Sequence, residues 1–258
     1  MSDMPLELVT IPCLKDNYAY LVKGVGPGEV TLIDAPEAAP IIAALEQRGW
    51  QLSTILITHH HHDHTDGVDA LRARYGAKVA GPAAEVAHLP RLDRALYDGD
   101  ILGEGDFRAV VIGVPGHTLG HITYHFPNAG LAFTADSLMA GGCGRLFEGT
   151  PAQMWASLAR LAALPPETLI CSGHEYTTSN LRFAATIEPQ NPDLASRIRA
   201  TAAARAQNLP TVPSQLREEL ATNPFLRAHM PEIKATLGLP TATDATAFAE
   251  MRARKDRF

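Results

Sequence analysis

The sequence predicts a layered α/β protein that continues into an all-helical C-terminal region. Over the first two thirds of the 258 residues, short apolar runs alternate with helical patterns and with turns rich in glycine and proline, which is the rhythm of layered α/β structure. Beyond about Tyr176 the strand signals stop, and alanine-rich helical segments interrupted by prolines follow. We therefore expect two regions, 1–175 and 176–258, the second too small and alanine-rich to have much core of its own.

Strands are predicted where short apolar runs end at turn residues. In chain order these runs are 29–33, 55–57, 78–80, 109–112, 131–135 and 168–171. Helices are predicted over 40–48, from about 68, and from about 244 to the end. Thr150 and Gln153 have the spacing of a capping box with proline at the first helical position, so a helix starts there. Its apolar stripe is interpreted as core: Met154, Trp155, Leu158, Leu161 and Ala162.

A run of five histidines and one aspartate, residues 59–64, follows the strand predicted at 55–57. Residues two apart on an extended segment point the same way, so His59 and His61 share a face. Asp63 and His64 lie where strand turns into helix, and two pairs of ligands can then face two metal ions. A solvated histidine-rich loop and a purification tag are the alternatives. A tag would be terminal, longer and without the aspartate, so a metal site is favoured.

Single candidate ligands follow three later strands. His117 lies in the turn after 109–112, Asp136 follows 131–135, and His174 follows 168–171. Loops on a rigid scaffold often carry function, so these placements complement the histidine run. Three other histidines are interpreted as ordinary hydrogen-bonded residues: His88, His125 and His229.

Together these positions resemble the metallo-β-lactamase superfamily. Four longer segments, 140–150, 173–177, 223–227 and 251–258, resemble more specifically the glyoxalase II family, the hydroxyacylglutathione hydrolases, and Asp16-Asn17-Tyr18 fits as well. The match spans essentially the whole chain. It implies that the first region is a four-layer αβ/βα sandwich that carries catalysis, and that the helical second region binds substrate.

The resemblance also implies a dinuclear metal centre. The implied ligands are His59, His61 and His117 for one ion and Asp63, His64 and His174 for the other, with Asp136 as the bridge. A carboxylate suits the bridge because it has two oxygens. Two divalent ions are expected per chain, zinc first, with iron or manganese as alternatives because histidine and aspartate accept all three. Zinc lowers the pKa of bound water to about 7, so metal-bound hydroxide is the expected nucleophile, with Asp63 and Asp136 as the catalytic carboxylates.

Other side chains have roles only by this resemblance. His60 and His62 are placed by alternation instead: they lie off the ligand face, so we expect them to hydrogen-bond to ligand side chains or to lie in solvent. For His121 we expect at most a hydrogen bond to a ligand. The residues implied for the glutathione portion are Arg145, Phe147, Tyr176, Asn180, Arg252 and Lys255. Arginine pairs with carboxylates through two bonds and lysine supplies a charge, which suits a peptide with two carboxylates. For Arg252 and Lys255 the alternative is a solvated helix.

Two departures from the eukaryotic relatives fall within this set. Arg145 and Phe147 stand where those relatives have Lys and Tyr, so one hydroxyl contact is absent.

Composition narrows the classes of function. A net charge of −6 argues against nucleic acid as the main partner. No apolar stretch approaches a membrane span, and residues 1–5 lack the pattern of a secretion signal. The three cysteines contain no Cys-x-x-Cys pair, which indicates a reducing cytosol. Cys143 is interpreted as a packing residue rather than a nucleophile, and residues 24–28 as a turn rather than a phosphate loop.

We expect a cytoplasmic, monomeric enzyme that hydrolyses S-D-lactoylglutathione to D-lactate and glutathione, the second step of methylglyoxal detoxification. The enzymatic alternatives are another thioester or lactone hydrolase of the superfamily, or a persulfide dioxygenase, which would need a single iron and lack the helical tail. A diiron electron-transfer module is the rival from another class. Such modules carry Glu at the position of His61 and are joined to a flavin domain, and neither feature is present here.

Overall fold

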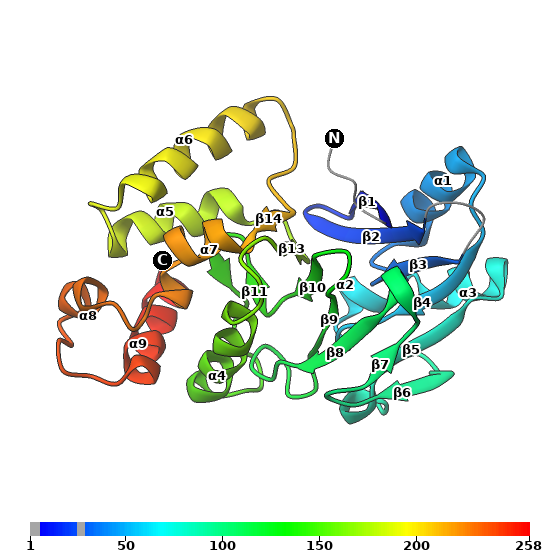
Figure 1. The fold of residues 1–258 in the computed structure, drawn as a ribbon, viewed down its shortest axis with the longest axis horizontal. Coiled ribbons are helices and arrows are strands. Elements are labelled where there is room, and N and C mark those ends of the chain that lie inside the picture. Colours follow the sequence, from blue (N-terminus) through cyan, green and yellow to red (C-terminus); the bar gives the residue numbers. More distant parts are fainter. Residues whose placement is uncertain (1–5, 25–28) are drawn as a thin grey trace. The chain divides into compact units, whose positions relative to one another are not determined.

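The computed structural model describes residues 6–24 and 29–258 (Figure 1). The turn predicted at 24–28 and the N-terminal segment 1–5 lie outside the described residues, apart from Gly24 at the end of a strand. Two compact units are present: Met1–Gly113 with Gly120–Phe133, and Val114–Leu119 with Thr134–Phe258.

The first sheet has the strand order β1-β2-β3-β4-β5-β6. Its strands are β1 (Leu6–Cys13), β2 (Asn17–Gly24), β3 (Val30–Ile33), β4 (Leu52–Leu56), β5 (Lys78–Pro82) and β6 (Arg94–Leu96). The first three strands pair antiparallel, whereas β3 to β6 pair parallel. The carboxyl ends of β3 and β4 therefore meet at one edge of the sheet.

Helices connect the parallel strands. They are α1 (Ala38–Arg48), α2 (His62–Thr65) and α3 (Val68–Tyr75), with a 3-10 turn η1 (Ala83–Glu85) after β5. Ile41 and Leu45 of α1 and Leu71 of α3 are fully buried in one apolar cluster with Leu32 and Val79 of the sheet. Burial of these residues fixes the helices on the sheet and so fixes the loops at the strand ends.

The second sheet has the order β14-β13-β10-β9-β8-β7. Its strands are β7 (Ile101–Leu102), β8 (Ala109–Gly113), β9 (Ile122–Phe126), β10 (Leu131–Ala135), β13 (Leu169–Ser172) and β14 (Ser214–Gln215). A separate hairpin follows β10, made by β11 (Leu138–Met139) and β12 (Gly142–Cys143), and η2 (Gly105–Phe107) precedes β8. The strands predicted at 109–112, 131–135 and 168–171 are thus confirmed to within one residue at each end.

The C-terminal region is helical, as predicted. Its elements are α5 (Thr177–Ile187), α6 (Pro192–Ala206), α7 (Leu216–Thr222), η3 (Pro224–Leu226), α8 (Pro231–Leu237) and α9 (Asp244–Arg257). Proline stands in the first turn of α6 and of α8, where its missing N–H costs nothing. The one departure is β14, which pairs antiparallel with β13. Two residues are too short to leave an alternating pattern in the sequence.

Helix α4 (Pro151–Ala162) begins at the predicted capping box. The Thr150 side chain accepts from the Gln153 N–H, and the Gln153 side chain accepts from the Thr150 N–H at 2.8 Å. Met154, Leu158 and Leu161 are fully buried, whereas Trp155 is only partly covered and packs against Phe248 of α9. The stripe is therefore core.

Candidate metal centre

The histidine-rich loop leaves β4 at the edge where β3 also ends. Asp34, the residue after β3, accepts from the Thr58 N–H and hydroxyl, both at 2.8 Å, and lies 2.8 Å from Nδ1 of His64. Asp34 is buried and adopts the left-handed conformation with φ +56°, which is strained for a residue with a side chain. One carboxylate thus fixes both ends of the loop and directs Nε2 of His64 away from itself.

His59 and His61 share a face, as predicted. Nε2 of His59 lies 3.1 Å from Nδ1 of His61, and Nδ1 of His59 lies 3.0 Å from the Thr58 hydroxyl. His59 is fully buried, and the ring of His121 stacks on it with centroids 4.6 Å apart. Two imidazole nitrogens at this separation suit a shared ion with Zn–N bonds of about 2.0–2.1 Å.

Asp63 lies at the start of α2, with its side chain partly exposed. Asn17 donates to the Asp63 backbone carbonyl at 2.9 Å and to Oδ2 at 3.0 Å. The same Oδ2 lies 3.9 Å from Nε2 of His64. Asn17 therefore holds this carboxylate toward the His64 nitrogen that Asp34 leaves for a ligand role.

The two alternate histidines of the loop lie elsewhere. Nδ1 of His60 lies 2.9 Å from Oε2 of the buried Glu85, whose other oxygen accepts from the Gly120 N–H at 3.0 Å. The His62 side chain is 94% exposed and pairs with Asp66 at 3.3 Å. The prediction that neither shares the face of His59 and His61 agrees with these contacts.

The later candidates come together on Asp136, which follows β10. Nε2 of His117 and Nε2 of His174 each lie 3.3 Å from Oδ2 of Asp136, and all three side chains are buried. Nδ1 of His117 lies 2.7 Å from the Arg145 carbonyl, so this nitrogen donates and Nε2 keeps its lone pair. The ring of Tyr176 stacks on His174 with centroids 4.6 Å apart. The two imidazole nitrogens and the carboxylate oxygen thus converge, and such a group of donor atoms suits a bound cation.

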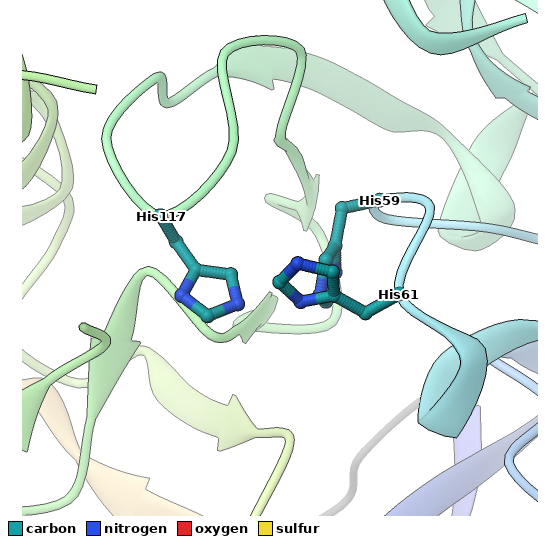
Figure 2. A group of neighbouring side chains, drawn as sticks. All are labelled: His59, His61 and His117. Atoms are coloured by element: carbon teal, nitrogen blue, oxygen red, sulfur yellow. The ribbon is translucent and has the colours of Figure 1, made fainter. Parts of the chain in front are cut away.

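Candidate ligand atoms form three groups among the described residues, and within each group they lie within 4.8 Å of one another. The groups are His59, His61 and His117; His59, His64 and Asp136; and Asp63, His64 and His174. Figure 2 shows the first of them. Imidazole and carboxylate donors backed by Asp34, Asn17 and the Arg145 carbonyl suit divalent metal ions.

Of the six residues implied for glutathione binding, three are exposed, one is partly buried and two are buried. The Arg145 side chain is 58% exposed, with Nε 3.5 Å from Asp256. Phe147 is 61% exposed and packs its edge against His117, and Tyr176 is 38% exposed. Asn180 is buried and donates to the Ala140 carbonyl at 3.0 Å.

Arg252 lies on α9 but is not solvated, since only 5% of it is exposed. It donates to the Cys143 carbonyl at 3.0 Å and to one oxygen of Asp256 at 2.9 and 3.2 Å. The alternative of a solvated helix face is therefore wrong for Arg252, whose guanidinium links α9 to the β11–β12 hairpin.

Lys255 occupies a partly buried position on the same helix. Its Nζ donates to the Ser179 carbonyl at 3.1 Å and lies 5.5 and 5.4 Å from the ring centres of Phe183 and Phe258. Burial, followed by the charge of Arg252, lowers the pKa of Lys255 from 10.5 to about 8. The ammonium is thus poorly solvated, which favours an incoming anion.

Cys143 is a packing residue in this structure. It is buried, and burial raises the pKa of its thiol even though Arg252 opposes the shift. Cys13 and Cys171 are also buried, and all three cysteines are free thiols.

Sequence reasoning missed Asp34 and Glu85. The sequence shows Asp34 only as the residue that ends a strand. The signal that could have identified it is a carboxylate directly after β3, the strand that pairs parallel with the strand before the histidine run. Glu85 lies in the short η1 turn, far from any motif, and has no comparable signal.

The chain is similar to known proteins in sequence and in structure. Residues 15–174 match the metallo-beta-lactamase superfamily, and residues 175–258 match the C-terminus of hydroxyacylglutathione hydrolase. A hydroxyacylglutathione hydrolase of Cereibacter sphaeroides is 61% identical over 255 residues, which cover 99% of this chain and all of that protein.

Two solved structures are similar in fold. The BLEG-1 B3 metallo-beta-lactamase superposes with a TM-score of 0.66 at 22% identity, over 85% of this chain and 99% of that one. TTHA1623, solved in a di-iron-bound form, superposes with a TM-score of 0.57 at 31% identity, over 65% of this chain and 91% of that one.

The chain therefore has the metallo-β-lactamase fold and belongs to that superfamily of metallohydrolases. Within the superfamily, the match over its full length makes it a member of the hydroxyacylglutathione hydrolases, or glyoxalase II enzymes. The predicted fold class and family are thus confirmed, and the alternative activities are not favoured. Within the described residues, no helix has the length and apolar character needed to cross a membrane.

Proposed function

We propose that this enzyme hydrolyses S-D-lactoylglutathione to D-lactate and glutathione at a dinuclear centre, as the second step of methylglyoxal detoxification. The ligands would be His59, His61 and His117 for one ion and Asp63, His64 and His174 for the other, with Asp136 as the bridge. The observation that carries the proposal is the approach of His117 and His174 to one oxygen of Asp136, each at 3.3 Å. We assign zinc, with iron and manganese as alternatives.

The metal ions, when bound, would make hydroxide available near neutral pH and stabilise the charge that develops on the thioester oxygen. The protein supplies orientation. Asp34 and the Arg145 carbonyl each occupy the Nδ1 side of a histidine, so Nε2 of His64 and of His117 is the nitrogen left to bind a metal.

Binding of the glutathione portion falls to side chains near the start of α5 and the end of α9. Arg145 and Lys255 supply positive charge for the two carboxylates. The Tyr176 hydroxyl offers a hydrogen bond, and Asn180 offers those of its side-chain atoms that the Ala140 carbonyl does not use. Arg252 is occupied by the Cys143 carbonyl and Asp256, so we assign it to holding this surface together.

We further propose catalysis by residues 1–175, substrate binding by 176–258, a monomer, and location in the cytoplasm. The free thiols of the three cysteines suit a reducing compartment.

The test is hydrolysis of a panel of glutathione thioesters, measured as loss of thioester absorbance. A lactone and a β-lactam are compared in parallel, each through its own change in absorbance. We expect turnover of the glutathione thioesters to exceed that of the other substrates by orders of magnitude, and turnover to stop after chelation and return with added metal. Equal rates on a small uncharged thioester would contradict the glutathione assignment.

A further inference from the structure

We propose that buried Glu219 is a positioning residue: together with Arg197 and Asn223 it holds the β11–β12 hairpin, and the hairpin in turn sets the orientation of the ligand His117. The role assigned to His117 rests on the proposed function. Glu219 itself touches neither ligand nor substrate residues, so its influence is transmitted through the backbone of residues 139–145.

Glu219 lies on α7 and is fully buried. Four donors meet its two oxygens. Oε1 accepts from the Arg197 guanidinium and, at 2.6 Å, from the Ser214 hydroxyl. Oε2 accepts from the Gly141 N–H at 2.8 Å and from the Asn223 side chain at 3.2 Å. A carboxylate can accept all four bonds, and burying its charge is tolerated only with such partners.

The side chain of Asn223 holds the backbone of both hairpin strands. Asn223 donates to the Met139 carbonyl at 3.2 Å and to the Gly142 carbonyl at 2.9 Å. Gly141, in the turn between them, has φ +67°, and a Cβ on Gly142 would lie 2.7 Å from Asn180. Close packing against Asn180 and the hydrogen bonds to Glu219 and Asn223 therefore restrict movement of the turn.

The end of the hairpin reaches the metal ligands within a few residues. The Gly144 N–H donates to the Ser137 carbonyl at 3.1 Å, and a Cβ on Gly144 would lie 1.9 Å from the Asp136 carbonyl. The next residue, Arg145, presents its carbonyl to Nδ1 of His117 at 2.7 Å. A displacement of Gly141 is thus passed to the carbonyl that contacts the His117 ring, because only residues 142–144 separate them and Gly144 is itself bonded to Ser137.

The same helical region contains a matched pair that does not touch the hairpin. Arg227 binds both oxygens of Glu188, with bonds of 2.9 to 3.2 Å, and the Glu188 side chain is 8% exposed. Replacing Glu188 removes the same kind of ion pair as replacing Glu219 does, so Glu188→Gln is the control for a general loss of stability.

The experiment compares Glu219→Gln, Glu188→Gln and the unmodified chain, all loaded with zinc. In Glu219→Gln the new side-chain amide would direct an NH2 group at N–H donors, which leaves buried donors unsatisfied. For this variant we expect the amide exchange rate of the peptide containing residues 138–145 to rise about tenfold. Zinc should be lost at a chelator concentration about tenfold lower, which is the size of effect typical of residues that support a metal ligand. Glu188→Gln should lower Tm without changing either quantity.

Three outcomes would overturn the inference: unchanged exchange and zinc retention in Glu219→Gln, equal changes in both variants, or faster exchange with unchanged zinc retention. If Glu219→Gln does not fold, Arg197→Lys serves instead, since it keeps the charge but not the two-nitrogen geometry, and the same changes should appear at smaller size. Neither readout needs substrate. If the unmodified chain failed to hydrolyse glutathione thioesters while these differences held, the proposed function would fall and the positioning role would stand.

Discussion

The two groups of candidate ligands are held in place in different ways. His59, His61, Asp63 and His64 lie in one loop, which Asp34 fixes at both ends from the neighbouring parallel strand. His117, Asp136 and His174 lie on three loops, and their surroundings depend on the β11–β12 hairpin and on helices from the end of the chain. The first group is therefore a local construction, whereas the second depends on contacts between residues far apart in sequence.

The largest effect is expected where the second group converges. Asp136→Asn keeps the shape of the side chain but loses the charge that offsets repulsion between two ions. We expect kcat to fall by more than about a hundredfold, beyond the effect of outer partners, with loss of metal. Elemental analysis together with circular dichroism measures both metal and fold. Retention of two ions and most of the activity would show that Asp136 does not bridge.

Asp34→Asn tests the local group. The amide cannot accept from both Thr58 and His64 as the carboxylate does, so metal affinity should fall about 10- to 100-fold. The matched control is Asp66→Asn, two residues after His64, which should leave affinity unchanged. Asp66 is exposed and, among the residues that the structure describes, its side chain pairs only with His62. Chelator titration followed by activity measures the affinity. Similar losses in the two variants would indicate a general effect of charge on the loop.

A smaller effect is expected at the substrate-binding end. Lys255→Ala should raise KM for a glutathione thioester about tenfold with little change in kcat, because one charged contact remote from the scissile bond is lost. Arg252→Ala should raise KM and also lower Tm, since it removes the bond to the Cys143 carbonyl. Steady-state kinetics and thermal unfolding separate the two cases. A purely structural effect of Lys255→Ala would appear equally on an uncharged thioester.

The smallest effect is a pH dependence. The pKa of Lys255 is lowered to about 8, first by burial and then by the charges of Arg252 and Arg182, while Cys143 and Asp256 oppose the shift. The Lys255 side chain is therefore charged below about pH 8 and neutral above it. We therefore expect kcat/KM for glutathione thioesters to fall severalfold as pH rises through about 8. Lys255→Arg should remove this fall, since arginine keeps its charge. An unchanged profile in Lys255→Arg would assign the pH dependence to another group.

The sequence predicts the strands that stand directly before the candidate ligands, and the structure has those strands at 109–113, 131–135 and 169–172. The metal-ligand roles of the histidine run, His117, Asp136 and His174 stay predictions. The role of Asp34 depends on the parallel pairing of β3 with β4. The sequence of neither strand alone predicts that the two are neighbours. The bond from Arg252 to Cys143 joins residues 109 apart, and the network around Glu219 is similarly long-range. Residue types alone also left the substrate open, and only the resemblance to a family identified glutathione.

The bond between the Arg145 carbonyl and His117 has an evolutionary consequence. Arg145 contacts His117, a proposed metal ligand, through its main-chain carbonyl, which every residue type has. Its exposed side chain is the part that would reach the substrate in the proposed function. If that proposal holds, substitutions at this position can change affinity for the glutathione portion while the main-chain contact with His117 is kept.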